Sequence, residues 1–208
     1  HRPLHVLPAP AGEVLVEGRP VQRPDRRRIF IFQEGGVFPW LTVRGNIGFG
    51  LGRRQRGDDH AVIQHYVEMV GLTGFEDSYP RELSGGMRQR VEIARALAAN
   101  PEILYMDEPF GALDYITRFK MRADLVRIWE AEQKTILFVT HDIDEAIQLA
   151  DRVLVMSRRP STIQEVVELD LPRPRDLSSP AYLERRECIF HAMGMSPNEG
   201  ILDRVTSK

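Results

Sequence analysis

Lysine is scarce in this chain, and its scarcity excludes one kind of phosphate-binding loop. The 208 residues contain three lysines, at Lys120, Lys134 and Lys208. A phosphate-cradling loop of the form G-x-x-x-x-G-K-[ST] needs a lysine directly after a glycine. These three lysines follow phenylalanine, glutamine and serine, so residues 1–208 contain no such loop.

Cysteine and long apolar runs are also nearly absent. The single cysteine, Cys188, excludes an intrachain disulfide framework and a zinc cluster built from cysteines. No apolar run approaches the ~20 residues that a helix needs to cross a bilayer. If this protein serves a membrane, we expect it to do so from the aqueous side, through a partner protein.

The chain has no surplus of basic charge. Its formal net charge of −2 argues against a dedicated nucleic-acid surface, so we expect no nucleic-acid partner. The cluster Arg26-Arg27-Arg28 is most simply interpreted as solvated surface. Hydrophobic residues make up 42% and charged residues 28% of the chain, which is ordinary for one soluble domain with a sizeable core.

Short apolar runs alternate with longer segments of helical spacing, which predicts an α/β fold. The predicted strands are residues 13–17, 29–32, 103–106, 135–139, 152–156 and 162–168. The predicted helices are residues 58–70, 86–99, 115–133 and 181–193. The strand–helix–strand order of the second half predicts a mainly parallel sheet, and the absence of a convincing strand in residues 44–99 predicts a helical insertion.

Three short motifs carry the candidate chemistry. The first, Leu83-Ser84-Gly85-Gly86-Met87, opens a predicted helix. Free backbone N–H groups at such a helix start can bind a phosphate, and the glycines allow close approach. The alternative is a purely structural role, in which Ser84 only caps the helix.

The second motif places Asp107 and Glu108 directly after a strand that is apolar at every position, as in a strand buried on both faces. Ligands bind α/β sheets at this carboxyl edge. Asp107 would hold Mg²⁺, and Glu108 would act as a base toward the terminal phosphate. An isolated Asp-Glu-Pro would more simply stabilise a turn, but the Ser-Gly-Gly start upstream and Leu113-Asp114 downstream favour the catalytic interpretation.

The third motif ends the next strand with His141. In a parallel sheet His141 would lie beside Asp107 and Glu108, reach the terminal phosphate and position the attacking water. A lone histidine there would more simply bond to backbone. Gln33, after the predicted strand 29–32, is also a candidate site residue with a plain structural alternative. Its side-chain carbonyl could contact the metal or the water.

Together, in this order, the motifs resemble those of the ATP-binding subunit of an ABC transporter, and the resemblance covers nearly the whole chain. Gln33 matches the Q-loop glutamine, Leu83–Met87 the signature with Met87 in place of the commoner Gln, and His141 the switch histidine. Asp107 and Glu108 match the Walker B pair, and Gly111-Ala112-Leu113-Asp114 the D-loop. Residues 38–43 and 171–176 are similar to the nitrate/sulfonate/taurine importer branch.

The resemblance implies a P-loop-NTPase-like ABC ATPase core that uses ATP and Mg²⁺ to energise solute uptake. The ATP-contacting residues would be Gln33, Leu83, Ser84, Gly85, Gly86 and Asp114. The metal would be bound by Asp107 and Gln33, and catalysis would rest on Glu108 and His141.

The implied partners are a transmembrane permease subunit, a second ATP-binding subunit and, indirectly, a solute-binding protein. The location would be cytoplasmic, on the inner face of the plasma membrane. The aromatic cluster Phe38-Pro39-Trp40 would anchor the permease, although plain packing explains such clusters about as often. Asp114 would bridge the two ATPase subunits, although capping of the following helix is an equally good account.

The chain departs from the family at its front. Family members carry an adenine-stacking aromatic residue and the Walker A loop upstream of the segment that resembles Gly12–Gly18, and eleven residues precede Gly12 here. We therefore expect residues 1–208 to form one ABC ATP-binding domain that lacks the first strands and the Walker A loop. Within it we expect a helical subdomain at about 44–99 and a C-terminal strand hairpin and helix at about 152–208.

Three functional interpretations remain open. The first is an importer ATPase subunit. The second is a catalytically silent fragment or regulatory half that pairs with a competent subunit through Ser84–Gly86 and Asp114. The third, an ABC-type ATPase that works on DNA or ribosomes, is disfavoured because the sequence has neither a long heptad tract nor a basic patch.

Overall fold

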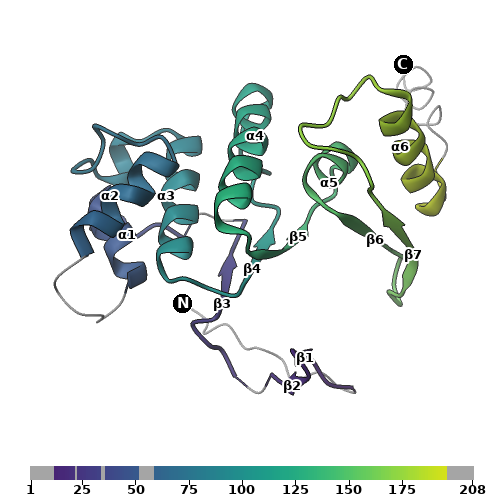
Figure 1. Cartoon of the computed structure of the whole chain (residues 1–208), viewed down its shortest axis with the longest axis horizontal. Coiled ribbons are helices and arrows are strands. Elements are labelled where there is room, and N and C mark those ends of the chain that lie inside the picture. Colours follow the sequence, from purple (N-terminus) through teal and green to yellow (C-terminus); the bar gives the residue numbers. More distant parts are fainter. Residues whose placement is uncertain (1–11, 22, 34–35, 52–58, 196–208) are drawn as a thin grey trace, which may run out of the picture.

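The computed structural model describes residues 12–21, 23–33, 36–51 and 59–195. Its centre is a three-stranded parallel sheet in the order β3 (Arg28–Ile31), β4 (Ile103–Asp107) and β5 (Thr135–Val139) (Figure 1). The register sets Ile31 beside Met106 and Met106 beside Phe138. All three strands therefore end at the same edge, as the parallel order predicted.

Between β3 and β4 the chain is helical. It forms α1 (Val43–Leu51), α2 (Asp59–Met69), the short 3₁₀ helix η1 (Pro80–Glu82) and α3 (Gly85–Ala98). α1 packs so closely on α3 that a Cβ atom on Gly50 would lie 2.1 Å from the Arg95 carbonyl oxygen. The insertion predicted between two core strands is thus present, and its helices share the main core with the sheet.

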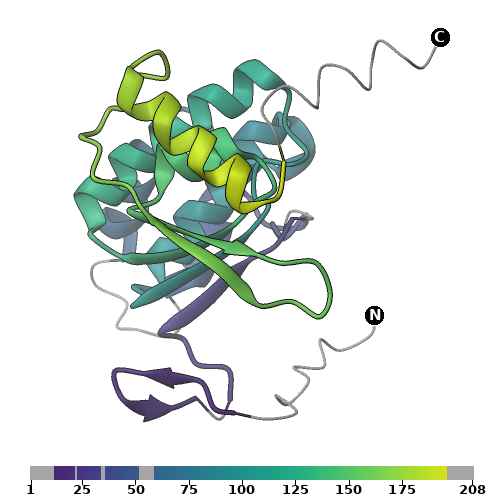
Figure 2. The same ribbon diagram turned by 90° about the vertical axis from the view of Figure 1, so that its right-hand side faces the viewer.

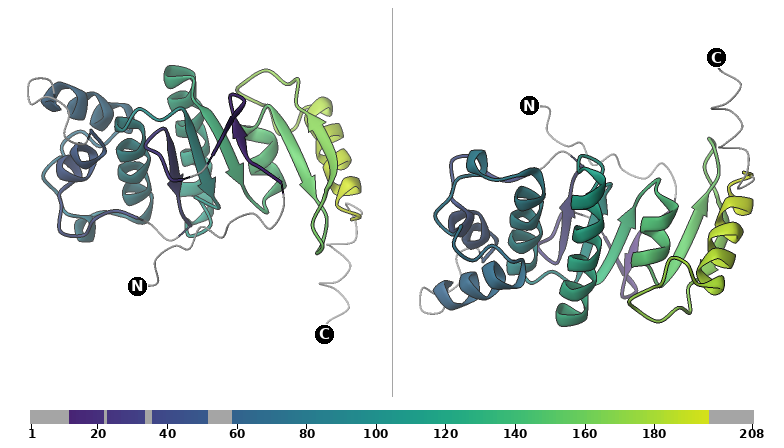
Figure 3. Two further views of the ribbon diagram at one scale, coloured as in Figure 1. Left: turned by 90° about the horizontal axis from the view of Figure 1, so that it is seen from below. Right: turned by 90° about the horizontal axis from the view of Figure 1, so that it is seen from above.

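Helix α4 (Tyr115–Glu132) connects β4 to β5 and, together with α3, covers one face of the sheet (Figure 3). The main core lies between these layers. It contains Leu104 and Met106 from β4, Met121 and Leu125 from α4, and Val91 and Leu97 from α3. These apolar positions recur at helical spacing, so burying them on the sheet stabilises the layer arrangement.

The C-terminal part forms a second, smaller core. Helix α5 (Ile143–Leu149) leads to the antiparallel hairpin of β6 (Arg152–Met156) and β7 (Ile163–Glu168), which α6 (Pro180–Ala192) covers (Figure 2). Ile147, Val155, Val167, Tyr182 and Ile189 are buried together. The turn at Arg158–Pro160 joins the two strands into the hairpin, as predicted.

In the described part of the chain, the opposite face of the parallel sheet is open. Phe30, Tyr105 and Leu137 are cross-strand neighbours on it, and the rings of Phe30 and Tyr105 stack at 4.5 Å. Phe30 is 54%, Leu137 46% and Val139 52% exposed. We call Phe30, Tyr105, Leu137 and Val139 the open sheet face. The expectation that residues 103–106 are buried on both faces is therefore wrong for the described part of the chain.

The remaining strands, β1 (Leu15–Val16) and β2 (Arg19–Pro20), form a small antiparallel pair, shorter than the strand predicted at 13–17. Figures 1 and 2 place this pair apart from the parallel sheet. Among the described residues, no helix combines the length and apolar character that crossing a bilayer requires.

Candidate functional site

Glu108 follows β4 with an unusual backbone conformation. Its φ is +43°, in the left-handed region that side chains other than glycine rarely adopt. Its amide still donates to the Val139 carbonyl at 2.8 Å, and its carbonyl accepts from Gly111 at 3.0 Å. The chain therefore turns sharply while Glu108 stays tied to the sheet edge. Such strain persists only where the surroundings hold it, and it is common at functional sites.

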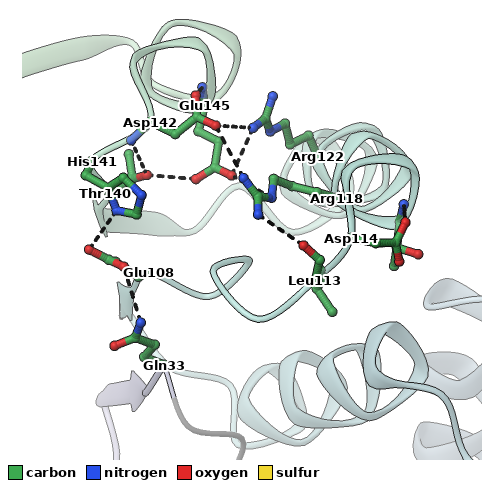
Figure 4. Close-up of polar contacts among 11 residues, drawn as sticks. Gln33, Glu108, Leu113, Asp114, Arg118, Arg122, Thr140, His141, Asp142 and Glu145 are labelled. Atoms are coloured by element: carbon green, nitrogen blue, oxygen red, sulfur yellow. Dashed lines mark hydrogen bonds and ion pairs between the residues drawn. The ribbon is translucent and has the colours of Figure 1, made fainter. Parts of the chain in front are cut away.

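The Glu108 carboxylate bridges two residues from the neighbouring strands (Figure 4). His141 Nδ1 donates to Oε1 at 2.9 Å, and Gln33 Nε2 donates to Oε2 at 3.3 Å. Gln33 follows β3 and His141 follows β5, so each of the three parallel strands contributes one side chain. The edge arrangement expected from the sequence is thus present, and His141 bonds to a carboxylate rather than to backbone.

His141 is electrostatically matched to Glu108. The hydrogen bond from its ring to the Glu108 carboxylate, helped by the charge of that carboxylate, raises the pKa of His141 above its ordinary value. The His141 side chain remains 75% exposed. A bound anion could therefore reach the imidazole without displacing it from Glu108.

Asp107 is the last residue of β4 and is exposed at the same edge. The described residues contain no group of three His, Cys, Asp or Glu side chains arranged to hold a metal alone. Mg²⁺ in nucleotide sites needs no such group, since phosphates and water supply most of its oxygen ligands and one or two protein groups suffice. The donor set of Asp107 and Gln33 fits that requirement.

The Ser84–Gly86 turn lies beside the start of α4. Ser84 caps α3 by accepting from the Met87 amide at 3.3 Å, so the capping role holds. Ser84 and Gly85 are exposed, whereas Gly86 and Leu83 are buried. A Cβ atom on Gly86 would lie 2.6 Å from Thr117 Cγ2, so glycine at this position lets the two helix starts meet.

Asp114 caps α4 and is exposed. It accepts a hydrogen bond from the Thr117 amide at 3.0 Å, and its hydrogen bonds with the Thr117 side chain and backbone lower the pKa of Asp114. The capping alternative therefore also holds here. A subunit-bridging role for Asp114, like nucleotide contact by Leu83, Ser84, Gly85 and Gly86, stays a prediction.

The aromatic cluster after β3 faces a groove. Trp40 is 70% and Phe49 62% exposed, and both rings contact Phe38, at centroid distances of 5.4 and 4.6 Å. The Arg95 guanidinium lies over the Phe38 ring, 4.7 Å from its centroid. Phe38 and Phe49 line a groove of about 480 Å³ between the sheet, α1 and α3.

Fully buried Asn46 holds the loop of this cluster in place. Its side-chain amide accepts from the Phe38 amide at 2.7 Å and donates to the carbonyls of Phe38, Leu41 and Thr42 at 3.0–3.1 Å. Sequence reasoning missed this residue. The only signal would have been an amide side chain at an otherwise apolar helical position.

Comparison with known proteins agrees with the motifs. The profile of the family described as ABC transporter matches residues 4–111. The chain belongs to the ABC transporter family. An aliphatic sulfonates import ATP-binding protein of Bacillus cereus is 48% identical over 179 residues, which are 86% of this chain and 71% of that protein.

An uncharacterized ABC transporter ATP-binding protein of Methanocaldococcus jannaschii is 47% identical over 184 residues, covering 88% of this chain and 69% of that protein. Among solved structures, a dimeric ATP-binding cassette in a post-hydrolysis state with ADP and Pi aligns with a TM-score of 0.63 and 31% identity. That alignment covers 77% of this chain and 74% of the cassette. The predicted family and ABC ATPase fold class are confirmed.

Proposed function

We propose that this chain is the ATP-binding and ATP-hydrolysing part of an ABC importer that takes up a small solute such as a sulfonate, taurine or nitrate. The observation that supports the proposal best is the Glu108 carboxylate, bridged by Gln33 and His141 at the carboxyl edge of the parallel sheet. One carboxylate at a strand end can be a turn element. A carboxylate aligned by a group from each neighbouring strand is organised for chemistry.

The side chains divide the work of hydrolysis between them. In the reaction the oxygen of a water molecule bonds to the γ-phosphorus as the bond from that phosphorus to the bridging oxygen breaks, which releases ADP and phosphate. Glu108 accepts the proton of the water. Gln33 and His141 orient Glu108, and the exposed edge of the His141 ring faces the negative charge of the phosphate. Asp107 and Gln33 would hold Mg²⁺, which would supply positive charge to the phosphate oxygens when bound.

A second ATP-binding subunit completes the site. Exposed Ser84 and Gly85 present the start of α3 outward, where backbone N–H groups attract the phosphates of a nucleotide bound mainly by the partner subunit. Asp114 lies beside this turn and would contact the same partner. Closing of the pair on ATP and reopening after hydrolysis would drive transport.

The groove beside Phe38 and Phe49 is the proposed permease contact. Trp40 on the loop before α1 and Phe49 on α1 are both mostly exposed, and exposed aromatic side chains suit an anchor for a partner helix. The chain would thus act in the cytoplasm, on the inner face of the plasma membrane, with a solute-binding protein acting indirectly. The choice of a sulfonate-like solute rests on the Bacillus cereus relative, whose printed name assigns it to aliphatic sulfonate import.

The test of the proposal is Glu108→Gln in the protein encoded by the whole reading frame that contains this chain, assembled with its permease in vesicles. We expect ATP binding to persist and kcat to fall at least ~100-fold, because the general base is lost. Glu187→Gln, at an exposed position on α6, is the matched control and should leave turnover unchanged. Unimpaired hydrolysis by Glu108→Gln would remove Glu108 from its role.

A second candidate is a catalytically silent or regulatory half that pairs with a competent subunit. The observation that favours it is the absence of any Gly-Lys-Ser/Thr turn in residues 1–208. The genomic sequence upstream of His1 distinguishes the two. A Gly-Lys-Ser/Thr turn in the same frame supports the hydrolysing subunit, and a start codon without such a turn supports the silent half.

A further inference from the structure

Charged side chains between the starts of α4 and α5 form a cluster that the proposed function leaves unused. Arg122 and Glu145 are its buried pair, with 8% and 5% of their side chains exposed. Arg122 Nη2 donates to Glu145 Oε1 at 2.9 Å and to Asp142 Oδ2 at 2.8 Å. An apolar pair of similar volume often stabilises a fold as well as a buried ion pair does. The charges here are therefore better explained by the geometry that they fix.

On one side, the cluster holds both neighbours of His141 (Figure 4). The Thr140 hydroxyl donates to Glu145 Oε2 at 2.8 Å and accepts from the Asp142 amide at 3.0 Å. Asp142 Oδ1 in turn caps α5 by accepting from the Glu145 amide at 3.1 Å. Thr140 is thus tied to the Glu145 carboxylate and Asp142 to the Glu145 amide, so Glu145 helps to fix the segment from which His141 reaches Glu108.

On the other side, the cluster holds the loop before α4 through Arg118. Arg118 Nη2 donates to the Leu113 carbonyl at 3.0 Å. The same guanidinium lies 3.7 Å from Asp142 Oδ2 and 3.8 Å from Glu145 Oε1. Leu113 precedes Asp114, and a Cβ atom on Gly85 would lie 3.5 Å from the Leu113 side chain. One arginine therefore contacts the loop beside the Ser84–Gly86 turn and the segment that carries His141.

We propose that Arg118 is a positioning residue that couples the loop at Leu113–Asp114 to the segment at Thr140–Glu145. What the coupling serves rests on the proposed function, in which Asp114 faces the second subunit and His141 faces the phosphate. Docking of the second subunit on Asp114 then constrains His141 through Arg118 and Glu145. The competing account is that the cluster only stabilises the packing of α4 on α5.

Hydrogen exchange on the chain itself separates these accounts. The amides of Gly111 and Leu113 are bonded to the Glu108 and Phe110 carbonyls, so their exchange reports opening of that loop. Glu145→Gln lies on the far side of the cluster and keeps its size and shape. We expect it to raise exchange in residues 111–114 by about tenfold, in parallel with 140–145, because the two segments open together.

The matched control is Asp124→Asn on the same helix. It breaks an ion pair with Arg90 at 2.5 Å, at a side chain 16% exposed, without touching the cluster. It should leave both segments at wild-type exchange, whereas Arg118→Leu should raise both and Arg118→Lys should restore part of the protection. The coupling is overturned if Glu145→Gln opens only 140–145, or if Asp124→Asn opens both segments to the same extent.

ATP turnover separates this inference from the proposed function. In the assembled transporter, Arg118→Leu should lower kcat with little change in the KM for ATP, because Arg118 aligns residues without contacting nucleotide. Coupled exchange in a protein without ATPase activity supports the coupling and removes the proposed function. Uncoupled exchange in an active ATPase removes the coupling alone.

Discussion

One backbone torsion sets the position of Glu108, and two neighbouring side chains contact its carboxylate. The φ of +43° lets the chain turn at Pro109 while the Glu108 amide stays bonded to β5. The carboxylate is then met by His141 and Gln33. Because the His141 ring is mostly exposed, this contact adds little stability, and its role in the proposed hydrolysis is alignment and charge.

The pKa of His141 is the direct measure of that contact. The Glu108 carboxylate raises the pKa of His141 in the folded protein. The stability that this contact contributes is therefore fully present at pH values below the pKa of His141 in the unfolded chain. This contribution is lost as the pH rises through the folded pKa.

NMR titration of the ring carbons should place the pKa of His141 above that of a free histidine. Glu108→Gln should bring it back toward the free value, because the partner charge is gone. The His141→Ala spectrum identifies the resonance. A pKa that does not respond to Glu108→Gln would contradict the contact.

The starts of α3 and α4 depend on each other. Gly86 is buried against Thr117, and Gly85, one position earlier, is exposed. Two adjacent glycines in the same motif therefore have different roles in the fold. Gly85 leaves the turn exposed, and Gly86 allows the starts of α3 and α4 to meet.

Substituting each glycine tests this difference. Gly86→Ala should lower the free energy of unfolding by about 1–3 kcal/mol, because the new methyl overlaps Thr117. Gly85→Ala should change it by less than about 0.5 kcal/mol, because its methyl would meet Leu113 at an ordinary 3.5 Å. Urea unfolding measures both.

Thr117→Ser removes the methyl that Gly86→Ala would strike. The double variant should recover most of the lost stability, which separates the contact from the general effect of alanine in a helix. Equal costs for Gly85→Ala and Gly86→Ala would contradict the packing account.

At the scale of the molecule, the described residues leave one face of the parallel sheet well covered and the other open. The covered face packs on α3 and α4. The open sheet face carries Phe30, Tyr105, Leu137 and Val139. Contiguous exposed apolar surface of this kind attracts apolar ligands or other chains.

Dye binding measures that surface. The chain should increase the fluorescence of anilinonaphthalene sulfonate, and Phe30→Thr together with Leu137→Thr should reduce that increase by about half or more. Tyr115→Thr is the control, since Tyr115 is 74% exposed on α4, away from this face. Fluorescence that the double variant leaves unchanged would place the dye elsewhere.

Periodicity and strand order predicted most of the fold. The strands after residue 100, the helices α2, α3, α4 and α6, and the hairpin at Arg158–Pro160 lie where the pattern indicated, because each follows from local spacing. The burial of β4 was not predictable in the same way. An apolar run such as residues 103–106 indicates that both faces of a strand could be buried. Whether the second face is covered depends on segments that are distant in the sequence.

The candidate site was predictable in part for a related reason. Parallel strands bring their ends to one edge, so Gln33, Glu108 and His141 could be placed together from the sequence. Arg118 and Glu145 could not, because pairing between the starts of two helices depends on how the helices cross. Nucleotide contact, metal binding and catalysis by the predicted residues stay predictions for the experiments above.

Two hydrogen bonds close to Gln33 in the sequence have a mechanical consequence. Three positions beyond Gln33, the Gly36 amide donates to buried Glu92 at 3.0 Å, and Arg95 donates to the Gly36 carbonyl at 2.7 Å. Both partners belong to α3, which begins at the diglycine turn. A rotation of α3 as a rigid body would therefore move the Gly36 backbone with it, and Gly36 lies three residues from the glutamine that contacts the proposed base.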